Sequence, residues 1–151
     1  MPLVGNRPRP FFDANVLFSA LSRDDSPPGV LLDFHVAGRI AVVVSTRVLD
    51  EVARNLEKNR PEVTARLRSI IAETPFEAAP SPSNDTVNAV THCIDAKDAP
   101  ILAAAITSGA DCIVSGNTRR FNQQAAECAG IAIFTPAAYL AALDRSNGMR
   151  R

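Results

Sequence analysis

Short continuous apolar runs along the chain alternate with longer stretches in which apolar residues recur every three or four positions. The apolar runs predict buried strands at residues 10–13, 40–44, 112–115 and 131–134, with a further short strand at residues 76–78. Helical spacing marks residues 15–22, 30–38, 47–58, 62–72, 85–93, 95–108, 121–128 and 136–143. Strands that alternate with helices are joined by crossovers, so the sequence predicts an α/β fold with a parallel sheet.

The breaks between these elements contain most of the prolines. Residues 23–29 are polar and include a proline pair, which we expect to exclude regular structure there. No linker or internal repeat divides the chain. We therefore expect a single domain over residues 1–151, with residues 1–9 and 144–151 as loose tails.

Composition limits the class of protein and of partner. Apolar residues make up 46% of the chain and charged residues 21%, as in an ordinary globular protein. The 16 basic and 16 acidic side chains balance, so a broad basic surface for a phosphate backbone is not indicated. No apolar run is long enough to span a bilayer, and the N-terminus lacks the apolar core of a secretory signal. We expect a soluble, cytoplasmic protein that does not contact a membrane.

Cysteine and histidine indicate no conventional site. Cys93, Cys112 and Cys128 are widely spaced and form no C-x-x-C motif. We interpret them as small buried apolar residues rather than as a zinc or redox pair. His35 and His92 lie far apart in the sequence, which argues against a catalytic histidine pair.

Polar groups follow the expected strands, at the edge where a parallel sheet binds ligands. Asp13 ends the first strand, and Asp98 lies at the start of the helix predicted at residues 95–108. Glu51 lies about one turn into a helix, and its side chain can reach back because helical side chains tilt toward the N-terminus. Asn117 lies in the turn after the strand at 112–115. We expect these four side chains to meet in one crevice.

Each of these residues also has a simpler structural explanation. Asp13 and Asn15 are of the types that cap helices, and Asp95 with Asp98 has the form of a capping box. Glu51 is an acid in the N-terminal half of a helix, where the macrodipole favours it. The inference of a site depends on their joint placement, because several carboxylates at one edge repel unless a cation neutralises them.

Five further residues are expected to support the site. Asn15 would hold Asp13, and Ser45 precedes the helix that carries Glu51, as an N-cap. Thr118 either caps the following helix or carries a metal-bound water. Arg119 and Arg120 leave the turn on the crevice side, where basic groups hold phosphate, or they form a solvated face.

Oxygen ligands without paired histidines or thiolates favour Mg²⁺ or Mn²⁺ as the cofactor. One such ion activates water at neutral pH. Two ions, roughly 3.5–4 Å apart, clamp the attacking and leaving oxygens of a phosphodiester. The residues are therefore compatible with metal-assisted hydrolysis of a phosphodiester.

The chain resembles the PIN-domain family of metal-dependent ribonucleases, which includes VapC-type toxins of bacterial toxin–antitoxin pairs. The resemblance covers residues 11–143 and rests on F-F-D-A-N-V-L-F-S-A, S-T-R-V-L-D-E-V-A, and K-D-A-P-I-L-A-A-A-I followed by A-D-C-I-V-S-G-N. It implies a three-layer α/β/α domain with a central, mainly parallel sheet. It also implies that Asp13, Glu51 and Asp98 are metal-binding carboxylates of an RNA-cleaving enzyme.

One residue departs from the family pattern. Many members carry a fourth acid in a T-G-D turn, where this chain has Asn117. An amide adds no charge, so we expect weaker binding of a second ion. An alternative is therefore a catalytically weak or inactive module that binds RNA or protein. A third hypothesis, a haloacid-dehalogenase-type phosphotransferase, fits less well because the second aspartate of that chemistry is replaced by Asn15.

The resemblance also implies partners. A toxin of this family would have an antitoxin protein that occupies the crevice, and a homodimer is expected on the same grounds.

Overall fold

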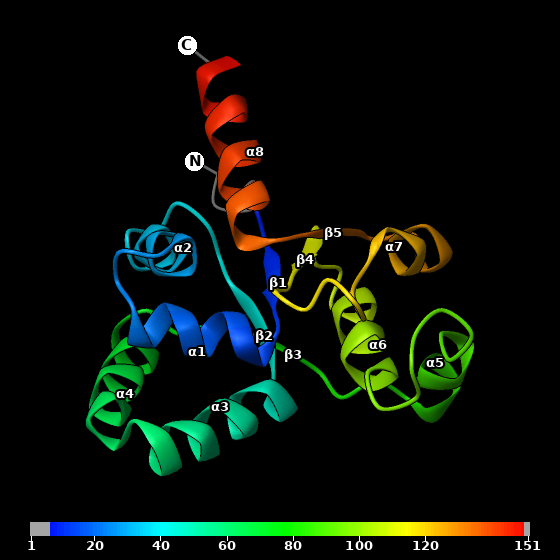
Figure 1. The fold of residues 1–151 in the computed structure, drawn as a ribbon, viewed down its shortest axis with the longest axis horizontal. Helices are drawn as coiled ribbons and strands as arrows, with labels where there is room; N and C mark the ends of the chain where they lie inside the picture. The colour runs from blue at the N-terminus through cyan, green and yellow to red at the C-terminus, as the bar shows by residue number, and fades with distance from the viewer. Residues whose placement is uncertain (1–6, 150–151) are drawn as a thin grey trace.

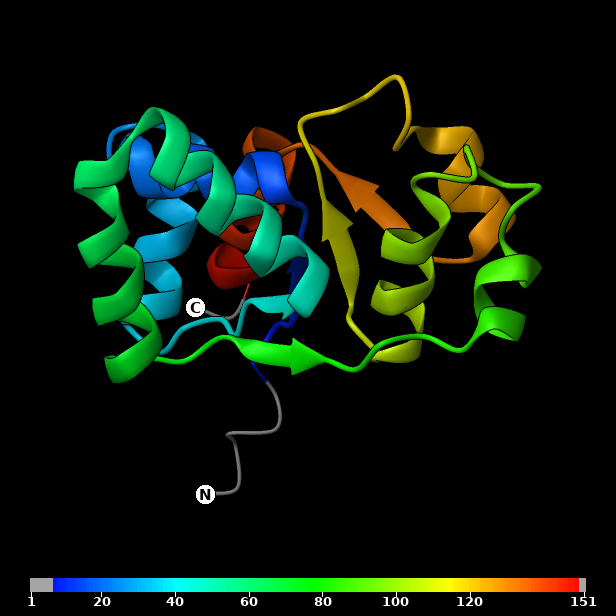
Figure 2. The ribbon, with the colours of Figure 1, turned by 90° about the horizontal axis from the view of Figure 1, so that it is seen from below.

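The computed structural model of the chain describes residues 7–149, which form a five-stranded sheet between two layers of helices (Figure 1, Figure 2). All strands are parallel and short: β1 (Pro10–Phe12), β2 (Val43–Ser45), β3 (Glu77–Ala79), β4 (Cys112–Val114) and β5 (Ala132–Phe134). The three-layer α/β/α fold and its parallel sheet, predicted from the sequence, are confirmed.

The helices divide between the two sides of the sheet (Figure 1). One side carries α1 (Ala14–Ser22), α2 (Pro27–Val36), α3 (Thr46–Asn59), the 3₁₀ turn η2 (Pro61–Val63) and α4 (Thr64–Glu73). The other side carries α5 (Asn84–Ala89), α6 (Ala99–Thr107) and α7 (Gln123–Ala129). The last helix, α8 (Pro136–Met149), packs against α2 and then runs out from the body of the domain. No helix within residues 7–149 is long and apolar enough to cross a membrane.

Strand order fixes where a ligand crevice can form. The sheet runs β3-β2-β1-β4-β5, so the chain starts in the middle, builds outward to β3, and returns to place β4 beside β1. In open parallel sheets the crevice lies beyond the carboxyl ends of the strands at the point where the order reverses. Here that point lies between β1 and β4.

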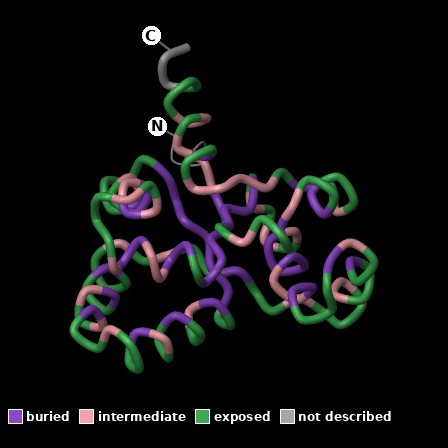
Figure 3. The backbone as a smooth tube through the Cα atoms, viewed as in Figure 1, coloured by how far each residue is buried: buried purple, intermediate pink, exposed green. Residues whose placement is uncertain are grey.

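The central strands β1, β2 and β4 are buried because helices cover both faces of the sheet, whereas the edge strands β3 and β5 are largely exposed or half-buried (Figure 3). Phe11, Phe12, Val43 and Ile113 are inaccessible to solvent and form the centre of the core. Burying a side chain of this size contributes roughly 1.5–3 kcal/mol. Such a core fixes the strand ends rigidly, and the polar residues that follow them inherit that position.

Three predictions about chain breaks and ends were wrong. Residues 27–29 were expected to be irregular, but Pro27 begins α2, with the Ser26 hydroxyl accepting the Gly29 N–H at 3.2 Å. Proline suits the first helical turn because its missing N–H would have no partner there. The expected C-terminal tail is helical as far as Met149, and residues 150–151 lie outside the described part.

The expected loose leader is also wrong for residues 7–9, while residues 1–6 lie outside the described part. The Arg9 N–H donates to Asp111 at 2.6 Å, and the Arg9 guanidinium binds Glu77 and donates to the Gly109 carbonyl at 2.8 Å. These contacts tie the residue before β1 to the start of β3 and to the segment before β4. They place Asp111, which directly precedes β4, at the end of the sheet opposite the crevice.

The cysteine interpretation was correct for one residue only. Cys112 is buried and free, but Cys93 and Cys128 form a disulfide across 35 residues of sequence. The bond joins the loop after α5 to α7. Spacing within the sequence does not reveal such a pair, because the fold brings the two residues together.

Candidate metal centre

Asp13 lies between β1 and α1 and is only 5% exposed. Its Oδ1 accepts the Val16 N–H at 3.0 Å, so it caps α1 as the structural explanation proposed. Its Oδ2 accepts a short hydrogen bond from the Ser115 hydroxyl at the end of β4. Both carboxylate oxygens are therefore held in place across the point where strand order reverses.

The pKa of Asp13 is raised above its ordinary value. Burial is the main cause, and the charges of Glu51 and Asp98 raise it further, against the opposing hydrogen bonds from Ser115 and Val16. The fold thus holds a carboxylate where its negative charge is disfavoured and where two other acids add to the cost. A cation in this position would relieve both effects.

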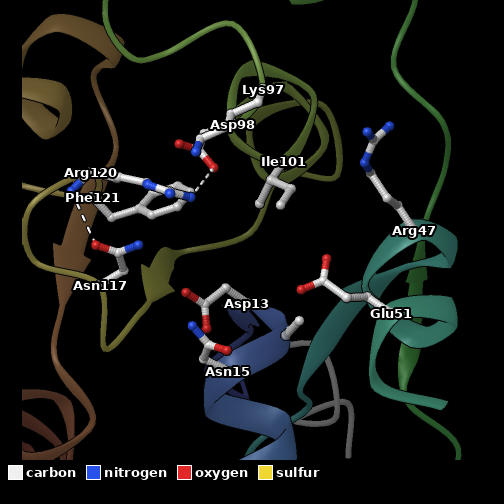
Figure 4. A pocket seen from close by; sticks show the side chains of 11 residues that line it. Asp13, Asn15, Arg47, Glu51, Lys97, Asp98, Ile101, Asn117, Arg120 and Phe121 are labelled. Carbon is white, nitrogen blue, oxygen red and sulfur yellow. Dashed lines mark hydrogen bonds and ion pairs between the residues drawn. The ribbon is translucent and has the colours of Figure 1, made fainter. Parts of the chain in front are cut away.

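Glu51 reaches the crevice from α3. Ser45 ends β2 and caps this helix by accepting the Val48 N–H at 3.2 Å. Figure 4 shows the Glu51 carboxylate directed toward Asp13 across the space beside Ile101. The neighbouring Asp50 is exposed and takes no part in lining this space.

Asp98 is 6% exposed and immediately precedes α6. The capping box expected with Asp95 is not formed: within the described residues no side chain caps α6, and the Asp95 carbonyl accepts the Asp98 N–H at 2.9 Å. Asp98 Oδ1 lies 3.5 Å from Nη1 of Arg120, and Oδ2 is buried without a hydrogen-bond partner in residues 7–149. An unpartnered buried carboxylate oxygen is a natural ligand position.

Asn117 follows β4 in the turn that the sequence singled out. Its N–H donates to Ser115 Oγ at 3.0 Å, and its Oδ1 accepts the Arg120 N–H at 3.4 Å. The hydroxyl of Ser115 therefore connects this turn to Asp13. The contact with Arg120 also leaves a second lone pair on the amide oxygen.

These side chains line a single cavity of about 220 Å³ (Figure 4). Its lining consists of Asp13, Ala14, Asn15, Arg47, Glu51, Lys97, Asp98, Ile101, Asn117, Arg120 and Phe121. The four residues that the sequence predicted to meet are all included. Ile101 and Phe121 add apolar walls, which lower the local dielectric and strengthen charge interactions.

The three acids line the same cavity, but their carboxylate oxygens do not converge on one point. Within residues 7–149, the only group of three potential ligand residues whose donor atoms lie within 4.8 Å of one another is His92, Cys93 and Cys128. A spread arrangement suits a hydrated ion, since Mg²⁺ keeps several waters and binds through one or two carboxylates. The donor set, all oxygen, fits the same class of ion.

The predicted supporting residues divide into two groups. Asn15 and Arg120 line the cavity. Ser45 instead lines a neighbouring cavity of about 280 Å³, and Thr118 and Arg119 are exposed outside both cavities. The carbonyl of Arg119 accepts a hydrogen bond from Asn122 Nδ2 at 2.9 Å. Of the two consecutive arginines, only Arg120 lines the cavity.

Two polar residues that line the cavity, Arg47 and Lys97, were not predicted. Arg47 lies four positions before Glu51 on α3, a spacing that places both on one helix face and would have revealed it. Lys97 precedes Asp98 directly. Ser115 ends the strand expected at residues 112–115, and its bond to Asp13 depends on the pairing of β1 with β4.

Comparison with solved structures identifies the same fold in other proteins. The "Crystal Structure of FitAcB from Neisseria gonorrhoeae" aligns at a TM-score of 0.56 with 16% identity over 83% of this chain and 96% of that chain. VapBC2 from Rickettsia felis, bound to a promoter DNA fragment, aligns at 0.59 with 13% identity over 84% and 98%. A toxin–antitoxin complex from Klebsiella pneumoniae aligns at 0.58 with 23% identity over 84% and 97%.

At the level of sequence, no curated protein matches the chain. A family profile described as "PIN domain" matches residues 9–119, which include Asp13, Glu51, Asp98 and Asn117. Because this match covers well over half of the sequence, the chain belongs to the PIN-domain family.

Proposed function

We propose that this protein is a metal-dependent ribonuclease that hydrolyses RNA phosphodiester bonds, with Asp13, Glu51 and Asp98 as its metal-binding carboxylates. The observation that carries the proposal is their meeting, with Asn117, in one cavity at the switch point of the sheet. The raised pKa of the buried Asp13 supports a site built for positive charge. Membership of the PIN-domain family supports a nuclease.

The residues present fit Mg²⁺ or Mn²⁺. All candidate ligands are oxygens, and Asp98 Oδ2 has no other partner among the described residues. Such an ion, when bound, supplies positive charge and lowers the pKa of a bound water to make it a nucleophile.

The side chains of the protein would orient the metal-binding carboxylate and the attacking water. Asp13 is held by Ser115 and the Val16 N–H, so its carboxylate is oriented before any ligand arrives. Glu51 projects from a capped helix, and Asn117 would orient the attacking water; Thr118, expected from the sequence to share this role, lies outside the cavity. These groups would fix the nucleophile in line with the scissile phosphate.

Basic side chains at the rim would hold the RNA backbone. Arg47, Lys97 and Arg120 all line the cavity, which gives a local positive rim although the chain is neutral overall. Arg120 would exchange Asp98 for a phosphate when substrate binds. Arg119 was an equal candidate in the sequence, but it does not line the cavity, which makes it the weaker one.

The test is cleavage of single-stranded RNA by the purified protein with Mn²⁺, compared with its Asp13→Asn variant and with added chelator. We expect cleavage only by the wild type with Mn²⁺. A matched pair on α3 sharpens the result: Glu51→Gln is expected to lose activity, and Asp50→Asn, one residue away and outside the cavity, to retain it. Cleavage that survives Asp13→Asn or chelation would refute the assignment.

The toxin role is proposed from the neighbours. Two solved relatives of the fold are toxin–antitoxin or VapBC assemblies, so we propose an antitoxin protein as partner, RNA in the cytoplasm as substrate, and a homodimer as the assembly. Induced expression in a bacterium should arrest growth, and Asp13→Asn should relieve the arrest. Equal growth with both would exclude toxicity through this site.

Asn117 favours a second candidate, a PIN-fold module that binds RNA or protein without cutting. The amide replaces a negative charge that many family members carry, and Arg120 partly neutralises Asp98. Failure to bind Mn²⁺ at millimolar concentration, with RNA binding retained, would support this candidate over the nuclease.

A further inference from the structure

His92, Cys93 and Cys128 form a cluster outside the acidic cavity. One donor atom from each lies within 4.8 Å of the other two, and His92 Nε2 is 3.7 Å from Cys93 Sγ. His92 and Cys128 are exposed and Cys93 is half-buried, so solvent reaches the cluster. The residues come from two elements, the loop after α5 and helix α7, which the disulfide joins.

The chemistry of these donors differs from that of the acidic cavity. Two sulfurs and one imidazole are the ligands of thiophilic cations such as Zn²⁺, whereas carboxylates and amides suit Mg²⁺ or Mn²⁺. In the disulfide the sulfurs are bonded to each other and offer no thiolate. The cluster can therefore hold a cation only after reduction.

We propose that, when the Cys93–Cys128 bond is reduced, this cluster becomes a binding site for one thiophilic divalent cation of the Zn²⁺ class, held by Cys93, Cys128 and His92. A thiol reductant gives two electrons and two protons to the disulfide and is itself oxidised to a disulfide. The two thiols of the protein then release their protons to solvent as the sulfurs bind the cation.

The fold permits this exchange with little movement. The Cα atoms of Cys93 and Cys128 are 5.5 Å apart. Two thiolates on one tetrahedral ion sit roughly 3.8 Å apart, given metal–sulfur bonds of about 2.3 Å. Rotation of one cysteine side chain to another staggered position would move its sulfur away from the other without backbone motion. Solvent supplies the fourth ligand, since the cluster is open to water.

The loop after α5 and helix α7 would therefore stay connected in both the oxidised and the reduced chain. Cys93 lies five positions before Asp98, and α7 follows the turn that carries Asn117 and Arg120. The disulfide in the oxidised chain and the cation in the reduced chain would each hold the loop after α5 against α7. The inference concerns a second site and does not require the ribonuclease proposal to be correct.

Co²⁺ provides a direct probe, because thiolate ligands give it an intense charge-transfer absorption that carboxylate ligands do not. The full chain is reduced with a phosphine, desalted without oxygen and titrated with Co²⁺. We expect the thiolate band to saturate at one equivalent, to disappear when Zn²⁺ is added, and to be absent from the oxidised chain. No thiolate band in the reduced chain would overturn the proposal.

Variants identify the ligands. Cys93→Ser and Cys128→Ser should each abolish the band, and His92→Ala should weaken Co²⁺ binding by about tenfold or more. Cys112→Ser is the control: Cys112 is buried, and burial raises the pKa of its thiol to about 12. A band that persists with unchanged affinity in Cys93→Ser, or that is lost only in Cys112→Ser, would overturn the assignment.

A second measurement covers variants that fail to fold. The reduced wild type is treated with an alkylating agent, with and without Zn²⁺, and each cysteine is quantified by mass spectrometry after digestion. We expect Zn²⁺ to slow the alkylation of Cys93 and Cys128 at least about tenfold, in line with thiolates that are held by a metal. Equal alkylation rates with and without Zn²⁺ would contradict the site.

Discussion

The hydroxyl of Ser115 donates a hydrogen bond to the carboxylate of Asp13, across 102 positions of sequence. The same hydroxyl accepts the Asn117 N–H at 3.0 Å. One serine thus connects the acid that ends β1 to the turn that follows β4. The hydrogen bond also opposes the increase in the pKa of Asp13 that burial causes.

Ser115→Ala should weaken cation binding at acidic pH. Without the hydroxyl, the pKa of Asp13 rises further, and protons compete with the cation up to a higher pH. We expect the pH midpoint of Mn²⁺-induced thermal stabilisation to move upward by on the order of one unit. Thermal unfolding with and without Mn²⁺ across a pH series measures this.

Ser45→Ala is the matched control for this variant. Ser45 is also a buried serine at the end of a strand, and it caps α3, so its loss should cost about 1 kcal/mol of stability. It does not line the acidic cavity. The pH midpoint should therefore stay in place, and equal shifts in both variants would contradict a specific role for Ser115.

Asn117→Asp should strengthen Mn²⁺ binding. The substitution adds a fourth negative charge to the cavity lined by Asp13, Glu51 and Asp98. We expect an affinity increase of about tenfold and, without metal, a loss of about 1 kcal/mol through repulsion. Calorimetric titration with Mn²⁺ gives the first quantity. Asn88→Asp, exposed on α5, should change neither, and no gain in Asn117→Asp would place this side chain outside the site.

Arg120→Gln should weaken RNA binding more than Arg119→Gln. Arg120 lines the cavity and contacts Asp98, whereas Arg119 does neither. With metal chelated to prevent cleavage, we expect the Kd for single-stranded RNA to rise about tenfold and the slope of log K against log salt to fall by about 0.7. The Arg119 variant should keep the wild-type slope. Equal losses in both variants would indicate a diffuse basic surface instead.

Stability should decrease as pH falls below about 6.5 because of His35. Burial lowers the pKa of His35 from its ordinary value of 6.5, while Thr74 O lies 2.8 Å from Nε2 and Nδ1 accepts the Val42 N–H. In this pH range the unfolded chain binds a proton at His35 that the folded chain does not bind. The free energy of unfolding therefore falls by up to about 1.4 kcal/mol per pH unit. Asp13, with its raised pKa, acts in the opposite direction at lower pH.

Comparison of variants isolates the histidine contribution. Chemical denaturation of His35→Gln between pH 7 and 5 should show a flatter dependence than the wild type. His92 is exposed, so His92→Gln should follow the wild-type curve. A wild-type slope retained in His35→Gln would assign the effect to other groups.

Reduction of the Cys93–Cys128 bond in the presence of chelator should lower the free energy of unfolding. The bond closes a loop across 35 positions, for which the chain-entropy estimate is about 3–4 kcal/mol. The double variant Cys93→Ser, Cys128→Ser should match the reduced wild type and show no response to reductant. If the oxidised wild type is no more stable than the double variant, the bond adds nothing to the fold.

The strands and the meeting of the four polar residues could be predicted from the sequence for one physical reason. Parallel strands buried on both faces leave apolar runs, and the residues that follow them reach one edge. The errors share a different cause. Pro27 was misjudged because proline both interrupts and begins helices, and its role depends on Ser26 as a cap.

Long-range geometry accounts for the rest. Nothing in the local sequence relates Cys93 to Cys128 or Ser115 to Asp13, since each pair is made by tertiary packing. Likewise, the sequence cannot tell which of two consecutive arginines faces the cavity. That direction is set by the turn that Asn117 begins.

Arg9 holds the amino-terminal end of the sheet through Glu77, Asp111 and Gly109, a strand length away from the acids. The contacts that anchor the strands and the acids of the proposed site therefore lie at opposite ends of the same three-residue strands. Substitutions at the acidic rim would therefore change the proposed activity while the contacts of Arg9 keep the fold in place. A homologue that has lost the acids could therefore keep the same fold.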